Sequence, residues 1–179
     1  MTTDTLLQKE LCKYRVILWT YLLPLPFMFA FLYWVCGALT PPTHLFGDKT
    51  TSPFDFWSFQ HFLNGIIFAW IYMNLREAPT KLDCLWTVLF ISFAWEGHEA
   101  WAEIGMRGAL IAGWTGGVEH WTNRVITDPL LVLCGALLFF AYPKIAKPAL
   151  ALTTCWICAN LALPDCMTLQ TLLLTHWPF

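Results

Sequence analysis

Long apolar runs separated by short polar stretches make up most of the chain. A helix that crosses a bilayer needs about 20 mostly apolar residues, and five stretches meet this requirement. They cover approximately residues 16–39, 56–75, 82–101, 121–142 and 148–163. A sixth apolar stretch, residues 168–179, is too short to cross and is typical of an interfacial helix. The pattern predicts an all-α bundle in one domain, with five transmembrane helices and a short C-terminal interfacial helix.

The composition agrees with this pattern. Of the 179 residues, 58% are hydrophobic and 12% are charged, whereas soluble domains carry about 25% charged residues. The formal net charge of -2 leaves no basic surface for nucleic acid. We therefore expect the lipid bilayer to be the main partner, with other membrane subunits as further candidates.

The distribution of cations predicts the orientation of the bundle. Cytoplasmic loops of membrane proteins are enriched in Lys and Arg. With the N-terminus in the cytoplasm, most of the ten cations face that side: Lys9, Lys13, Arg15, Arg76, Lys81, Lys144 and Lys147. Only Lys49, Arg107 and Arg124 then lie toward the outer side. The sequence thus predicts a multi-pass protein with a cytoplasmic N-terminus.

Ionisable side chains within the predicted spans gather toward their outer ends. Inserting such a group costs about 2.5–3.5 kcal/mol, so each one retained calls for an explanation. Glu96 and Glu99 share a face of one helix, and His120, Arg124 and Asp128, at i, i+4 and i+8, share a face of another. His61 lies on a third span. We expect these faces to form a polar chamber open to the outer side.

The side chains of this chamber are candidate ligands. The predicted ligand or metal set is His61, Glu96, Glu99, His120 and Asp128. The predicted supporting residues are Asn64, His98, Asn123, Arg124 and Asp165. Imidazole and carboxylate groups suit zinc, iron or manganese, so a divalent metal is a candidate cofactor. A buried ion-pair network, a metal site and a site for a polar ligand or lipid head group all remain open.

Two classes of function follow from these features. In the first, the protein is not an enzyme and binds a polar ligand, a lipid head group or a metal, as an accessory subunit of a membrane complex. In the second, it is an intramembrane metal-dependent hydrolase or transferase acting on lipid or peptide. Glu99 would then be the general base, with His61, Glu96 and His120 as metal ligands. The sequence itself identifies no catalytic residue.

Short motifs in the polar segments resemble a known family. Gln60-His61-Phe62-Leu63-Asn64-Gly65 is similar to a Ser-His-x-x-His-Gly motif, and Trp95-Glu96-Gly97-His98-Glu99 is similar to Trp-Glu-x-x-Glu. Asp128 and Asp165 match two further acidic positions. On these residues the chain resembles, as a divergent member, the domain-of-unknown-function 2585 family of bacterial inner-membrane proteins. The resemblance implies an inner-membrane location and a polar cluster at the matching acids and histidine, and no known reaction.

The seven cysteines allow one candidate disulfide. Cys36 and Cys166 both fall near the predicted outer face, where an oxidising compartment would permit a bridge. Cys155 and Cys158 have redox spacing, but they lie within a predicted span and are interpreted as small packing residues. The pairing of Cys36 with Cys166 stays open.

Overall fold

The computed structural model describes residues 15, 18–19, 22–23, 25–36 and 39–163, and every regular element within them is helical. The all-α prediction is therefore confirmed for this part of the chain. The helices are α2 (Leu25–Cys36), α3 (Phe56–Leu75), α4 (Lys81–Trp101), η1 (Ala102–Met106), α5 (Ala109–Thr115), η2 (Asn123–Thr127), α6 (Asp128–Ala141), η3 (Pro143–Ile145) and α7 (Ala146–Ala162). Asp165, Cys166 and the predicted interfacial helix lie outside the described residues.

Two helical segments are long and apolar enough to cross a membrane, Asn123–Ala141 and Pro143–Ala162. The other described helices do not meet this criterion, so the five-span bundle is not confirmed. The predicted second and third spans nevertheless form α3 and α4. Polar residues lower the mean hydropathy of α4, because it carries Glu96 and Glu99 at one end and Lys81 and Asp83 at the other.

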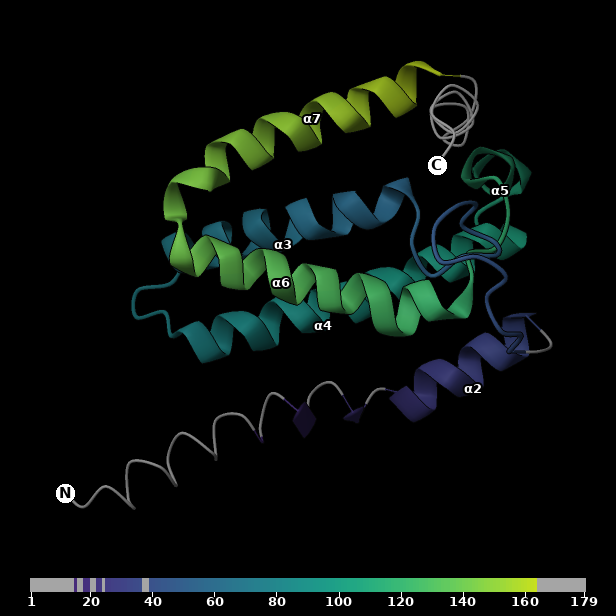
Figure 1. Cartoon of the computed structure of the whole chain (residues 1–179), viewed down its shortest axis with the longest axis horizontal. Coiled ribbons are helices and arrows are strands. Elements are labelled where there is room, and N and C mark those ends of the chain that lie inside the picture. Colours follow the sequence, from purple (N-terminus) through teal and green to yellow (C-terminus); the bar gives the residue numbers. More distant parts are fainter. Residues whose placement is uncertain (1–14, 16–17, 20–21, 24, 37–38, 164–179) are drawn as a thin grey trace.

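Three helices form the centre of the molecule. Figure 1 shows α3, α4 and α6 running side by side, with α7 along one flank and α2 on the opposite flank. The most extensive packing is between α3 and α6. The short helix α5 lies beside the end of this bundle where α3 begins.

Side-chain caps fix where α3 and α4 begin. The Asp55 carboxylate accepts a hydrogen bond from the Ser58 backbone N–H at 2.9 Å, and the Ser58 hydroxyl accepts one from the Asp55 backbone N–H at 3.1 Å. This reciprocal pair is a capping box. The Thr80 hydroxyl accepts from the Asp83 N–H at 3.1 Å at the start of α4. The cap at Asp55 places His61 in the second turn of α3.

Glycines bring α3 and α6 into close contact. A Cβ atom built on Gly65 would lie 2.0 Å from the Val132 carbonyl oxygen, and one built on Gly135 would lie 2.1 Å from the Phe62 carbonyl oxygen. Small residues allow such close approach in membrane bundles. His61 lies one turn before Gly65, so the crossing brings its ring toward the start of α6.

Apolar side chains fill the end of the bundle away from this cluster. This apolar core begins one turn after His61 and continues toward the α3–α4 connection. Its buried members include Leu63, Ile66, Ile67, Val88, Val132, Ala136 and Phe139. Polar and apolar interiors are therefore segregated along the helix axes.

Candidate functional site

Acidic side chains are in excess in the polar end of the bundle, which we call the chamber. Within the described residues its acids are Asp55, Glu96, Glu99, Glu103, Glu119 and Asp128. Its fixed cations are Lys49 and Arg124. All of these are buried except Glu99, which is partly exposed. Six carboxyl groups thus share two permanent positive charges.

Arg124 joins several acids into one network. Its Nη1 donates to the Glu96 carbonyl oxygen at 3.0 Å and lies 3.5 Å from Glu96 Oε2. Its Nη2 pairs with Glu103 and lies 3.3 Å from Glu119 Oε2. The Lys49 Nζ pairs with the second oxygen of Glu103. A forked guanidinium can serve several carboxylates at once, which a lysine cannot.

The loop residues around this network have shifted pKa values. Burial lowers the pKa of Lys49, but Glu103, Glu119 and Glu99 outweigh burial and leave that pKa above its usual value. Burial raises the pKa of Glu119 to about 8, although Arg124 opposes the shift. Burial also raises the pKa of Asp55 to about 6, against hydrogen bonds from Ser58. Burial thus favours the protonated forms of both Glu119 and Asp55.

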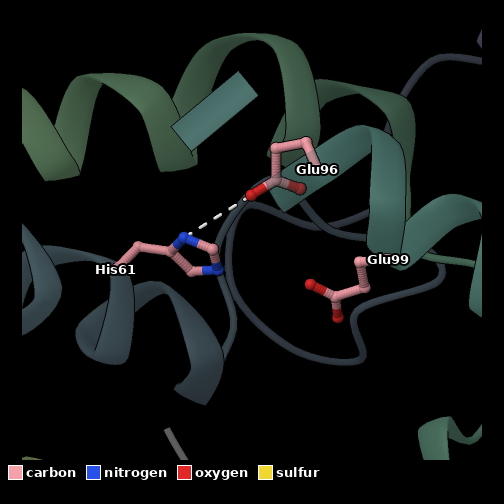
Figure 2. Close-up of side chains that lie close together, drawn as sticks. All are labelled: His61, Glu96 and Glu99. Atoms are coloured by element: carbon pink, nitrogen blue, oxygen red, sulfur yellow. Dashed lines mark ion pairs between the residues drawn. The ribbon is translucent and has the colours of Figure 1, made fainter. Parts of the chain in front are cut away.

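His61 lies between carboxylates from two other helices. Its Nδ1 is 3.5 Å from Glu96 Oε1, and its Nε2 is 3.5 Å from Asp128 Oδ2. Figure 2 shows His61 of α3 facing Glu96 and Glu99 of α4. One ligand atom from each of these three residues lies within 4.8 Å of the others. We call His61, Glu96, Glu99 and Asp128 the inner group.

Glu96 also belongs to a second set of neighbouring acids. Single carboxylate oxygens of Glu96, Glu119 and Asp128 lie within 4.8 Å of one another. Both sets are close enough to hold one metal ion, and both include Glu96. Glu96 therefore connects the Arg124 network to the inner group.

The inner group has unsatisfied oxygens. Glu96 Oε1 and both carboxylate oxygens of Asp128 accept no hydrogen bond within the described part of the chain, although both residues are fully buried. Buried polar atoms in proteins nearly always have a partner, and leaving a buried charge unpaired is expensive. The inner group therefore fits a bound cation.

His120 lies apart from the other predicted ligands. It directly precedes the helix that starts at Trp121, and its Nδ1 is 2.7 Å from Thr122 Oγ1 and 3.3 Å from the Thr122 backbone N. It belongs to neither set of metal-capable residues among those described. The i, i+4 spacing to Arg124 does not place it on their face, because the helix begins after it.

Of the predicted supporting residues, some contact the chamber and others lie away from it. Asn123 Nδ2 donates to Glu119 at 3.1 Å and lies 3.5 Å from Asp55. Asn64 accepts from Gln60 at 2.9 Å and lies beside the chamber, whereas His98 is exposed, 3.4 Å from Arg107. Asp165 lies outside the described residues.

The predicted ligand and supporting sets lack four residues of the chamber, Glu103, Glu119 and the loop residues Lys49 and Asp55. Lys49 is 2% exposed, and its carbonyl oxygen accepts from the His120 N–H at 2.7 Å. A usable signal was present, because Lys49 is one of three cations on the predicted outer side, where membrane proteins carry few. Asp55 carried no signal beyond its position before an apolar run.

A cavity of about 320 Å³ adjoins the inner group. Side chains of α3, α4 and α7 form most of its wall. His61, Glu99 and Lys49 line it, together with Trp57, Trp95 and Trp114. Small-molecule sites have volumes of about 300–1,000 Å³, so the cavity is large enough for a ligand.

Comparisons with known proteins identify no relative. No family model, no curated protein and no solved structure matches the chain. The geometry of the chamber is therefore the basis for a functional assignment.

Proposed function

We propose that this protein is a multi-pass membrane protein that binds a divalent metal ion in its outer chamber. His61, Glu96 and Glu99 are the ligands, and Asp128 accepts a hydrogen bond from the second ring nitrogen of His61. The observation that carries the proposal is the set of buried, unsatisfied carboxylate oxygens around His61.

The charge balance supports a cation. With six carboxyl groups and two fixed cations, full ionisation would leave a buried charge of 2 − 6 = −4. Buried ionised groups need partners of opposite charge or must take up protons. A divalent ion in the inner group removes half of this excess and supplies the partner that Glu96 lacks, and it fixes the His61 ring so that its other N–H is directed to Asp128.

The donor set indicates which metals fit. One imidazole with two carboxylates is typical of zinc, iron or manganese sites, and three protein ligands leave positions for water or another ligand. A metal-bound histidine usually donates its other ring N–H to a carboxylate, which fixes the ring. The positions of Glu96 and Asp128 on opposite sides of the His61 ring match this arrangement.

Metal content of matched variants tests the proposal. We expect the purified full chain to bind about one zinc or manganese ion per molecule, by elemental mass spectrometry after equilibration with each metal. His61→Ala should weaken binding about 10–100-fold or more, because it removes the only imidazole of the inner group. His98→Ala should bind as the unchanged protein does, since His98 is exposed and outside the group.

Thermal unfolding separates metal loss from misfolding. Added metal should raise the unfolding midpoint of the unchanged protein and of His98→Ala, but not that of His61→Ala. A second pair, Glu96→Gln against the exposed Glu77→Gln, repeats the comparison with carboxylates. If all forms are free of metal and His61→Ala changes only the midpoint, the chamber is a structural ion-pair network.

We also propose that the chain spans the inner membrane five times and is a divergent member of the family it resembles. The positions that carry the resemblance support this, because His61, Glu96, Glu99 and Asp128 all belong to the inner group. Residues matched only by sequence similarity thus converge in space. Lipid, and other membrane subunits, would cover the exposed apolar side chains of the outer helices.

A second candidate function is an intramembrane metal-dependent hydrolase or transferase. The cavity favours it, since His61 and Glu99 both line this space. In this function His61 and Glu96 would hold the metal, with open positions toward the cavity, and Glu99 would not be a ligand. Glu99 would act as general base, as the sequence predicts, and Asp128 rather than His120 would assist His61. If the Glu99→Gln variant retains bound metal but no longer hydrolyses a lipid ester that the unchanged protein hydrolyses, this function is supported.

A further inference from the structure

The cavity beside the inner group is a slot with two chemically different ends. Along α3 it runs from Trp57 to Phe68, eleven residues or about 16 Å of helix. Along α4 it runs from Glu99 back to Ile91. The remaining wall comes from α5 and α7, and the exposed Ile157 and Leu161 of α7 lie toward the start of α3, since the preceding Trp156 packs on Trp57.

The end near the start of α3 is polar and rich in indole groups. Lys49, His61 and Glu99 lie there, with Trp57 and Trp114 beside them. Tryptophan combines an apolar ring with an N–H donor and is enriched where one end of a ligand or lipid is polar. This end suits a charged or polar head group.

The other end of the slot is apolar. Phe68 and Ile91 form its walls, and Ile91 is more than one-third exposed. Exposed apolar walls that continue from a buried polar site fit a hydrocarbon chain. A rigid polar metabolite would leave these walls without contacts.

We propose that the slot between α3, α4 and α7 binds a single-chain amphiphile with an anionic oxygen head group. The head group lies beside His61 and Glu99, and the hydrocarbon chain runs toward Phe68 and Ile91. The choice of an anionic head rests on the proposed metal, whose open positions face the slot and prefer oxygen ligands. Lys49, which pairs with Glu103, lines the same end.

Dodecanoate is a suitable probe for the slot. The metal-loaded full chain in phosphatidylcholine nanodiscs should retain about one dodecanoate in native mass spectrometry, and acetate should not compete. Ile91→Phe narrows the apolar end at an exposed position, so the fold tolerates it, and should weaken binding by at least about tenfold. Ile71→Phe is the matched control, because Ile71 is exposed on α3 outside the slot and should leave binding unchanged.

The head group is tested with the same protein. Dodecyl phosphate should bind as dodecanoate does, and dodecylammonium should bind at least about tenfold more weakly. Stripping the metal should weaken dodecanoate binding by a similar factor. Tighter binding of dodecylammonium, or dodecanoate binding that is the same with and without metal, overturns the head-group assignment.

Failure of this proposal is distinguishable from failure of the metal site. If the chain binds metal but Ile91→Phe and Ile71→Phe hold dodecanoate equally well, or no dodecanoate binds, the slot assignment is wrong and the metal site stands. If no metal binds and dodecanoate binding still depends on Ile91, the metal proposal and the head-group assignment fail, while the slot assignment is supported.

Discussion

Two cations illustrate how single residues organise the chamber. Lys49 and Arg124 are exceptions to the predicted distribution of positive charge across the membrane. Both are buried, and both pair with Glu103. Removing either would leave Glu103 with one cationic partner instead of two, and breaking a buried ion pair typically costs about 3–5 kcal/mol. Two of the three cations that depart from the predicted charge distribution thus neutralise buried acids.

Asp55 predicts a specific pH dependence of stability. Burial raises its pKa to about 6 from a usual value of 3.8, so the folded chain holds this proton more tightly than the unfolded chain. The contribution to stability is therefore full below the unfolded pKa and falls as the pH rises through about 6. Asp55→Asn keeps an acceptor for the Ser58 N–H but has no proton to lose.

The measurement is the unfolding midpoint of both forms across pH. From about pH 4 to about pH 7.5, the midpoint of the unchanged protein should fall relative to that of Asp55→Asn. Titrating groups that do not interact with Asp55 cancel in the difference, whereas Glu119, whose pKa Asp55 raises, does not. A difference that stays constant with pH would contradict the shifted pKa of Asp55.

At the scale of elements, periodicity predicted the extents of helices better than their irregularities. The predicted second span and α3 share the same bounds, because Asp55 and Ser58 cap the start of one continuous apolar segment. The π-helical turns η1 and η2 were not predicted, since hydrophobic spacing carries no mark of an extra residue per turn. They carry Glu103 and Arg124 and are common at functional sites.

The α3–α6 crossing gives a prediction about packing. Gly65→Ala should lower the free energy of unfolding by about 1–3 kcal/mol, because its Cβ would overlap the Val132 carbonyl and overpacking of this kind is costly. It should also weaken metal binding by separating His61 from Asp128. Unfolding in mixed micelles by detergent titration measures the first effect, and metal titration the second.

Gly97→Ala is the matched control on α4. No atom lies within 4 Å of its Cβ position, and alanine is the better helix former, so this variant should gain about 0.5–1 kcal/mol. Equal stability of the two variants would mean that the close crossing does not hold α3 against α6.

At the scale of the molecule, the proposed topology predicts the side reached by each connection. Truncated chains ending at Glu77 or Lys144 and fused to green fluorescent protein should fluoresce, because both positions face the cytoplasm. Fusions of alkaline phosphatase at Gly116 or Leu163 should be active outside. If the fusions at Glu77 and Gly116 report the same side of the membrane, α4 does not cross the bilayer.

The sequence could predict that acids and His61 converge at one end, because their depth follows from span length and charge distribution. It could not predict which acids pair with Arg124. That choice depends on the π-helical turn at Glu103 and on a loop that returns Lys49 to the interior. His120 shows the same limit, since the start of a helix one residue later turned its ring toward Thr122.

The segregation of polar and apolar interiors restricts what the protein can do with an ion. Below His61, within the described residues, buried apolar side chains such as Leu63, Val132 and Phe139 fill the bundle. In the proposed orientation, this seal faces the cytoplasm, so ions would load and unload from the periplasm alone. The protein would then respond to the metal concentration in the periplasm and would not let metal ions leak across the bilayer.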